Sequence, residues 1–231
     1  MTKAAPFLFP PIIPSLPIEG QNTLFPVGRI WCVGRNYAEH SREMGSDPER
    51  NPPFFFTKPA DSITTLSVLP FPVQTQKLHY EVELVVALAA GGANLTPEES
   101  RGLIYGYAVG LDMTRRDMQE DAKKNRHPWS LSKGFDNACP ISAIRPAEAV
   151  EDLEQSLITL TVNGDVRQSG RISDMIWSIP EMISVLSHSV TLRAGDLIMT
   201  GTPAGVGQVN PHDVLEASCD RVGHITLTYR E

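Results

Sequence analysis

The chain has 231 residues, of which 41% are hydrophobic and 20% are charged, and its formal net charge is −7. That length fits one sizeable domain or two small ones, and the hydrophobic content is enough to build a core, which excludes a disordered chain. The acidic balance argues against a nucleic-acid-binding protein, because such proteins carry basic patches. No apolar run is long enough to cross a bilayer. From the charge we expect no nucleic-acid partner, and from the missing apolar run we expect no membrane partner.

The three cysteines, Cys32, Cys139 and Cys219, lie far apart and form no Cys-x-x-Cys pair. An odd number at wide spacing fits neither a disulfide framework nor a zinc site. The N-terminus lacks the basic and then apolar pattern of a secretion signal. We therefore expect a cytoplasmic protein with reduced thiols.

Residues 1–28 are rich in proline and show no hydrophobic periodicity. This pattern predicts an extended N-terminal arm that lies over the body or on a partner subunit. Residues 29–231 are expected to form the single folded domain of the chain.

From residue 29 onward the sequence indicates many short strands and a few helices. Capping patterns at Thr96 and Ser178 mark helix starts, and the Asn163-Gly164 pair predicts a tight hairpin. The predicted strands are 29–33, 54–58, 78–86, 105–112, 157–162, 165–168, 197–200, 214–219 and 224–229, and the predicted helices are 36–45, 97–105, 114–124 and 179–188. This irregular order predicts an α+β, β-rich domain with antiparallel or mixed sheets.

One predicted strand, residues 78–86, carries two glutamates on the same face. Glu81 and Glu83 are two residues apart, so both point away from the side that Val82 and Leu84 turn toward a core. Two carboxylates about 6.5 Å apart along a strand can hold one cation between their tips. They can equally be solvated groups on a half-buried strand, and this stretch alone does not separate the two interpretations.

A third carboxylate follows the next long strand, where Asp112 stands at the end of residues 105–112. Aspartate is poorly suited to strands, so its position calls for a reason. Three carboxylates without a nearby cysteine favour a hard divalent cation, Mg²⁺ or Mn²⁺, with open positions for water and substrate. His79, beside the glutamates, is interpreted as a packed or hydrogen-bonded histidine rather than a ligand.

Other polar residues carry weaker signals. His40 and Glu43 are three residues apart on a short predicted helix, so they form either a solvated ion pair or a proton-transfer pair. Arg116 and Gln119 share a helix face in the same way. The segment Gly201–Gly207 matches no phosphate-binding loop, so it is either a flexible loop or a backbone site that, with Thr202, receives a carboxylate.

Taken together, these segments resemble one known family. In chain order they are Cys32–Tyr37 with His40 and Glu43, Phe56–Pro59, His79–Glu83, Gly110–Asp117, Lys133–Asp136, Val162–Gly164 and Thr200–Gly207. This set, over residues 29–229, resembles the fumarylacetoacetate hydrolase family, within it the acylpyruvase branch, and most closely the fumarylpyruvate hydrolases. The motifs are specific for the family and much less specific for the substrate.

The resemblance implies a role for each matched residue. It implies a β-roll or sandwich catalytic domain at 29–231, and a homodimer. The implied metal ligands are Glu81, Glu83 and Asp112; the implied catalytic residues are His40, Glu43 and Lys133; and the implied substrate-binding residues are Arg35, Lys58, Arg116, Gln119 and Thr202. One departure is Tyr80, where the family commonly has a histidine. On the strand pattern Tyr80 faces away from Glu81, so the metal site is expected to survive.

The implied activity is metal-dependent hydrolysis of a C–C bond in a 2,4-dioxo acid, with fumarylpyruvate as the best candidate substrate. Water would be activated by Glu43 with His40, and the metal would stabilise the pyruvate enolate. Two alternatives stay open. The same site could decarboxylate oxaloacetate or interconvert the enol and keto forms of a 2-oxo acid, or the protein could bind a 2-oxo acid without turnover.

Overall fold

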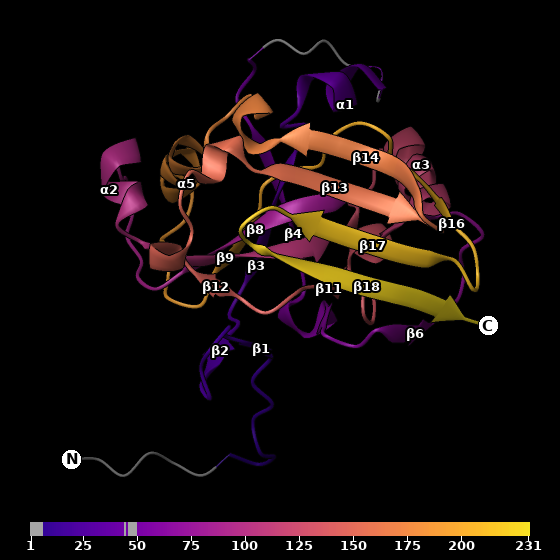
Figure 1. The fold of residues 1–231 in the computed structure, drawn as a ribbon, viewed down its shortest axis with the longest axis horizontal. Coiled ribbons are helices and arrows are strands. Elements are labelled where there is room, and N and C mark those ends of the chain that lie inside the picture. The colour runs from indigo at the N-terminus through magenta and orange to yellow at the C-terminus, as the bar shows by residue number, and fades with distance from the viewer. Residues whose placement is uncertain (1–6, 44, 46–49) are drawn as a thin grey trace.

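The computed structural model describes residues 7–43, 45 and 50–231 (Figure 1). Two mixed sheets dominate it, and the five-stranded sheet lies in front of the six-stranded one in Figure 1. The six-stranded sheet has the order β12 (Arg145–Pro146), β9 (Ile104–Leu111), β8 (Val82–Leu88), β15 (Leu197–Met199), β3 (Ile30–Gly34) and β4 (Phe54–Lys58). The five-stranded sheet has the order β14 (Asp165–Arg171), β13 (Leu157–Val162), β17 (Val214–Cys219), β18 (Gly223–Arg230) and β6 (Val68–Pro70).

Smaller elements surround these sheets. A three-stranded sheet has the order β10 (Thr114–Arg115), β7 (Leu78–Tyr80) and β16 (Gly207–Val209), and two strand pairs join β1 (Ser15–Pro17) to β2 (Leu24–Pro26) and β11 (Cys139–Pro140) to β5 (Ile63–Thr64). The α-helices are α1 (Ala38–Glu43), α2 (Pro97–Arg101), α3 (Arg116–Asn125), α4 (Ser130–Lys133) and α5 (Ile179–Ser187). Single 3₁₀ turns are η1 (Ala60–Ser62), η2 (Ala147–Ala149), η3 (Leu153–Gln155) and η4 (Ile172–Asp174). The predicted α+β, β-rich fold with mixed sheets and short helices is confirmed. Among the described residues, no helix has both the length and the apolar character needed to span a membrane.

The central strand β8 of the six-stranded sheet is buried on both faces. Val82, Leu84 and Val86 of β8 face the core between the two large sheets, as the alternation predicts. The opposite face of β8 is also covered, because Val85 and Ala87 pack in a second core. This second core includes Leu16, Ile18, Phe25 and Val27, which come from the segment around the β1–β2 hairpin. Every residue of β8 is therefore buried, including Glu83.

The predicted strand over residues 78–86 is interrupted at Glu81. Its first part, β7, pairs with β10 and β16, whereas its second part, β8, pairs with β9 and β15. The single residue between them belongs to neither ladder. This break places Glu81 at the junction of two sheets, where its side chain does not have to follow the alternation of either strand.

Turn and cap patterns in the sequence predict several boundaries well. Asn163 and Gly164 both have positive φ, 53° and 84°, as a type I′ hairpin requires, and the Ser178–Glu181 capping box opens α5. The helix predicted over residues 97–105 is shorter than expected. It ends at Arg101, because β9 begins at Ile104 and extends the six-stranded sheet.

Candidate metal and active site

Three buried carboxylates meet at one end of the six-stranded sheet. Val82 pairs with Leu111 across β8 and β9, so Glu81 and Glu83 come to lie beside Asp112, which directly follows β9. One oxygen from each of these three side chains lies within 4.8 Å of the others. The residues are 6%, 2% and 0% exposed, respectively, so the group is enclosed by protein.

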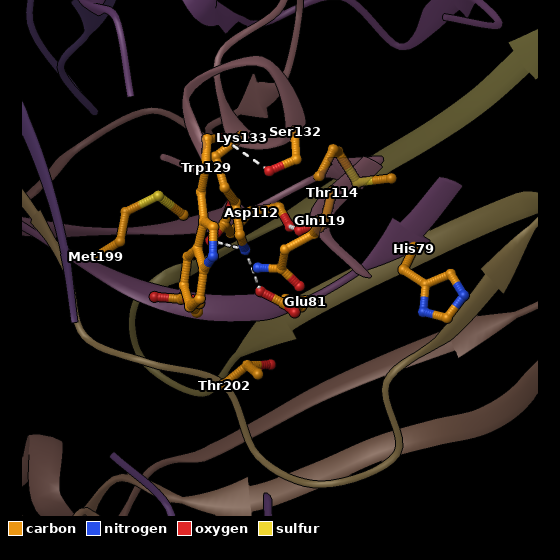
Figure 2. Close-up of polar contacts among 12 residues, drawn as sticks. His79, Glu81, Asp112, Thr114, Gln119, Trp129, Ser132, Lys133, Met199 and Thr202 are labelled. Atoms are coloured by element: carbon orange, nitrogen blue, oxygen red, sulfur yellow. Dashed lines mark hydrogen bonds and ion pairs between the residues drawn. The ribbon is translucent and has the colours of Figure 1, made fainter. Parts of the chain in front are cut away.

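Cations partly neutralise this cluster. The Lys133 ammonium donates to Glu81 Oε2 at 2.7 Å and to Asp112 Oδ2 at 2.6 Å, and Figure 2 shows it between these two carboxylates. Arg116 donates to Glu81 Oε1. Burial alone would raise the pKa of Glu81, but Lys133 and Arg116 outweigh burial and lower that pKa well below its ordinary value. Burial likewise opposes the charge on Lys133, yet Asp112 and Glu81 raise its pKa, so it remains an ammonium group.

Glu83 is the one carboxylate of the three without a cationic partner among the described residues. Its Oε2 accepts a hydrogen bond from the backbone N–H of Gly201 at 2.7 Å. Burial, and then the charges of Asp112 and Glu81, raise the pKa of Glu83 well above its ordinary value. Three oxygen donors within one small space, one of them lacking a counter-charge, fit a hard divalent cation such as Mg²⁺ or Mn²⁺. Glu81, Glu83 and Asp112 could together hold such an ion.

Lys58 lies behind Asp112, outside the set of residues that line the cavity above the carboxylates. Its ammonium nitrogen is 2.8 Å from Asp112 Oδ1, and both side chains are 0% exposed. The same nitrogen donates to the carbonyl oxygen of Met113 at 3.1 Å and to that of Lys133. Lys58, at the end of β4, therefore holds the Asp112 carboxylate in place without lining the cavity itself.

Helix α1 brings His40 and Glu43 to the cavity. Their contact is a 3.2 Å approach of His40 Nδ1 to Glu43 Oε2. His40 is buried and lines the same cavity as Glu81 and Glu83, whereas the Glu43 side chain is 34% exposed. The start of the helix is anchored by Asn36, whose side-chain amide donates to the carbonyl oxygens of Thr200 at 2.9 Å and Trp177 at 3.0 Å.

Helix α3 presents Arg116, Gln119 and Lys123 to the cavity. Arg116 donates to Gln119 Oε1 at 2.5 Å, which directs the amide nitrogen of Gln119 away from Arg116. No acceptor among the described residues takes the two N–H groups of this nitrogen. Arg116 Nε also approaches His79 Nδ1 at 3.3 Å. Burial, and then Arg116, lower the pKa of His79 to about 4, so His79 is a neutral acceptor here. Its ring points away from the carboxylates in Figure 2.

The segment Gly201–Gly207 is fixed by contacts with both parts of the site. Its Gly201 N–H binds Glu83, and its Gly205 N–H donates to the Glu43 carboxylate at 3.2 Å. Both glycines have positive φ, 95° and 98°, in the left-handed region that favours glycine. A Cβ atom at Gly205 would lie 1.9 Å from the carbonyl oxygen of Arg167, so this close packing requires glycine. Thr202, between them, is 2% exposed and lines the cavity.

Tyr80 lies on the side away from the carboxylates. It is 3% exposed, packs in the main core, and is not among the residues lining the cavity. Gly207 leaves room for its hydroxyl group, because a Cβ atom there would come within 2.4 Å of the Tyr80 oxygen. The tyrosine at position 80 therefore affects the packing of β7 against β16.

The structure gathers most of the predicted site residues around one cavity. The predicted residues that line it are Arg35, His40, Glu81, Glu83, Arg116, Gln119, Lys133 and Thr202. Sequence reasoning missed the residues Val33, Gly34, Phe54, Phe56, Lys123 and Trp129, which line it as well. The Trp129 ring packs edge-on against Phe54 and Phe56, at centroid distances of 5.8 and 5.6 Å. Lys123 had a usable signal, because it lies four residues after Gln119 on the same helix face.

Comparisons with known proteins show the family to which the chain belongs. The family model described as fumarylacetoacetate (FAA) hydrolase C-terminal matches residues 29–229. The mouse mitochondrial oxaloacetate tautomerase FAHD1 is 43% identical over 205 residues, which cover 85% of this chain and 92% of that protein. The Escherichia coli oxaloacetate tautomerase YcgM is 42% identical over 207 residues, which cover 88% and 93%.

Among solved structures, the fumarylpyruvate hydrolase of Pseudomonas aeruginosa in complex with Mn²⁺ and pyruvate is 45% identical, with a TM-score of 0.94. The match covers 97% of this chain and 99% of that one. This structural match confirms that the chain has the fold predicted from its resemblance to the family. The protein is an enzyme of the fumarylacetoacetate hydrolase family.

Proposed function

We propose that this enzyme hydrolyses the C–C bond of an acylpyruvate, and that its substrate is fumarylpyruvate, which gives fumarate and pyruvate. One observation carries the proposal: a His–Glu pair and a cluster of three buried carboxylates line or border the same cation-rich cavity. Hydrolysis needs both a group that activates water and a site that accepts a pyruvate enolate as leaving group. The related fumarylpyruvate hydrolase holds Mn²⁺ and pyruvate, which supports this choice of substrate.

The carboxylate cluster is proposed as the seat of the cofactor. A divalent cation held by Glu81, Glu83 and Asp112 would act as a Lewis acid toward the 2-oxo acid end of the substrate. Lys58 and Lys133 fix the orientation of Asp112 by contacting its two oxygens separately.

Donors around the cavity would hold the 2-oxo acid end. The two N–H groups of the Gln119 amide have no acceptor within the described part of the chain, and Thr202 lines the same space. Arg116 is fixed by Glu81 and Gln119, so it adds positive charge at a defined place. Together these residues would bind the carboxylate and the 2-oxo oxygen.

Glu43 is proposed as the base. It accepts a proton from water, and its contact with His40 at 3.2 Å keeps its carboxylate oriented. The resulting hydroxide attacks the distal carbonyl carbon. Lys133 has three N–H groups, of which two bind Glu81 and Asp112, so the third can donate to the oxyanion that forms. The C–C bond then breaks, its electron pair leaves with pyruvate as the enolate, and the proton that Glu43 took from water is returned to the enolate carbon.

The distal end of the cavity supports a substrate with a second carboxylate. Arg35 and Lys123 line the cavity, and neither has a carboxylate partner among the residues that the structure describes. Burial, and then the neighbouring charges of Arg116 and Arg35, lower the pKa of Lys123 and outweigh the opposing effect of Glu81. The fumaryl carboxylate would supply an anionic partner for these cations, whereas an acetyl group would not.

Tautomerisation or decarboxylation of oxaloacetate is the second candidate. The relatives named oxaloacetate tautomerase favour it, and oxaloacetate also carries a second carboxylate. Both reactions pass through an enolate but need no attacking water. They should therefore depend less on Glu43 than hydrolysis does.

A product assay separates these candidates. Enzyme supplied with Mn²⁺ is incubated with fumarylpyruvate, acetylpyruvate or oxaloacetate, and pyruvate, fumarate and the enol absorbance are followed. We expect equal amounts of fumarate and pyruvate from fumarylpyruvate, at the highest kcat/KM of the three. Consumption of the oxaloacetate enol without any cleavage of fumarylpyruvate would reject the hydrolase proposal in favour of the second candidate.

A further inference from the structure

One buried amide next to the site has no role in the proposed hydrolysis. Gln168 lies on β14, a strand whose other residues are exposed or half-buried, and it is itself 0% exposed. The register of β14 on β13 shifts at this point, since Leu160 pairs with Gln168 but Thr161 pairs with Val166. Arg167 is therefore an unpaired bulge residue. A bulge of this kind redirects the neighbouring side chain, here inward toward the Gly201–Gly207 segment.

The Gln168 amide makes three hydrogen bonds, and they determine its orientation. Its Oε1 accepts from the backbone N–H of Val82 at 2.9 Å. Its Nε2 donates to Thr202 Oγ1 at 2.7 Å and to the carbonyl oxygen of Pro203 at 2.7 Å. A backbone N–H can only donate and a carbonyl oxygen can only accept, so the reversed amide would lose both backbone partners.

The orientation of the Gln168 amide determines whether the Thr202 hydroxyl acts as a hydrogen-bond donor or acceptor toward the cavity. Its oxygen accepts a hydrogen bond from Gln168, so its own hydrogen must be directed elsewhere. Within the described part of the chain, no acceptor takes that hydrogen. Thr202 lines the cavity, and in Figure 2 it lies on a loop apart from Glu81 and Asp112. The hydroxyl group is thus left as a donor toward the cavity.

We propose that Gln168 is a positioning residue that fixes the Thr202 hydroxyl as a hydrogen-bond donor to an anionic oxygen of the bound 2-oxo acid. This inference rests on the proposed function of the site. Gln168 does not touch the substrate and acts only through Thr202. The same amide also binds Val82, which lies between Glu81 and Glu83, so it ties the carboxylate-bearing segment to the substrate-binding loop.

Only glutamine meets the requirements of this position. One acceptor and two donors are needed at the end of a side chain of this length. Glutamate offers no donor when ionised, lysine offers no acceptor, and methionine fills the space without either. With glutamate there, the Thr202 hydroxyl would turn to donate to the new carboxylate and would no longer serve the ligand.

Oxalate is a suitable probe, because it is a planar dianion with the shape of a pyruvate enolate. Calorimetric titration of oxalate into the Mn²⁺-loaded protein is compared for the unsubstituted chain, Gln168→Met, Thr202→Val and the double variant. We expect each single substitution to weaken oxalate binding about tenfold, the value of one hydrogen bond to a charged group. The double variant should bind about as weakly as Thr202→Val alone, because no hydroxyl is left to orient. Gln155→Met, at an exposed glutamine, is the control and should bind oxalate normally.

The double-variant cycle separates a positioning role from a structural one. If Gln168 only stabilised the fold, its substitution would weaken binding by the same factor with or without the Thr202 hydroxyl. If the two single losses of oxalate affinity multiplied, so that the double variant bound oxalate about a hundredfold more weakly than the unsubstituted chain, the proposal would be overturned. If Gln168→Met does not fold, Gln168→Glu keeps the size and the Val82 acceptor and enters the same cycle with the same expectation. Failure of the unsubstituted Mn²⁺-loaded protein to bind oxalate would instead reject the proposed function, and this inference with it.

Discussion

The floor and the mouth of the cavity differ in how their charges are paired. The floor, defined as Glu81, Glu83, Asp112, Lys58 and Lys133, is buried, and contacts of 2.6–2.8 Å link Lys133 to Glu81 and both lysines to Asp112. Glu83 has no cationic partner among the described residues and is held by the Gly201 N–H. The mouth, defined as Arg35, Glu43 and Lys123, is more exposed. Its two cations have no carboxylate partner within the described residues. A buried floor in which every charge except that of Glu83 is paired suits chemistry that all substrates of the site would share, whereas a less paired mouth suits recognition of the part of the substrate that varies.

The largest effect is expected on the floor. Glu83→Gln keeps the size of the side chain and an acceptor for the Gly201 N–H, but it removes one ligand charge. We expect kcat/KM for fumarylpyruvate to fall on the order of 10⁴-fold, because a Lewis acid is worth several kcal/mol. Mn²⁺ affinity, measured by calorimetry, should fall as well. Glu216→Gln, at an exposed position of β17, is the matched control, and an unchanged Mn²⁺ affinity in Glu83→Gln would refute the ligand assignment.

The second expected effect concerns stability. Lys58→Met leaves the Asp112 carboxylate buried with one partner fewer, and we expect a loss of about 3–5 kcal/mol in the free energy of unfolding. Urea titration of the metal-free protein measures it. Lys77→Met breaks an exposed ion pair with Glu120 and should cost about 1 kcal/mol or less. Equal losses in the two variants would remove the distinction between the buried floor and an ordinary surface.

Glu43→Gln tests the mouth where it takes part in the chemistry. We expect kcat for fumarylpyruvate to fall about 10²-fold or more, since the carboxylate is the proposed base. Mn²⁺ binding should not change, because Glu43 is not part of the carboxylate cluster. The rate of oxaloacetate enol–keto conversion, measured in parallel, should fall less. A fully active Glu43→Gln variant would reject the assignment of the base.

The smallest effect concerns recognition of the distal carboxylate. Lys123→Met should lower kcat/KM for fumarylpyruvate about tenfold and leave that for acetylpyruvate unchanged, since only the first has an anion to bind. Lys124→Met, at the next position of α3, is the control. An equal loss of kcat/KM for both substrates would mean that Lys123 does not bind the distal carboxylate.

Much of the floor could be predicted from the sequence, because its signals are local. The alternation around Glu81 and Glu83, and an aspartate at the end of an apolar strand, are enough to predict a cluster of three carboxylates. The position of Lys58 could not be predicted in this way. Whether a strand-end lysine enters the cavity or supports Asp112 from behind depends on the packing of β4 against its neighbours.

The parts that sequence reasoning missed depend on tertiary contacts. Trp129 follows α3 in a short connection without periodicity, so nothing local places it over Phe54 and Phe56. Gln168 reads as a polar residue on the exposed strand of a hairpin, and only the bulge at Arg167 turns it inward. The break at Glu81 also follows from pairing with two different sheets, which the continuous pattern over residues 78–86 conceals.

The most direct test of the metal-dependent floor is a stoichiometric titration. The protein is stripped with a chelator, the chelator is removed, and Mn²⁺ is added in steps while the loss of fumarylpyruvate is followed. Activity should be absent at the start and should rise to a plateau at one Mn²⁺ per chain, and Glu83→Gln should show no such plateau. Full activity of the stripped protein, with chelator present throughout the assay, would contradict the assignment of Glu81, Glu83 and Asp112 as the seat of the catalytic cation.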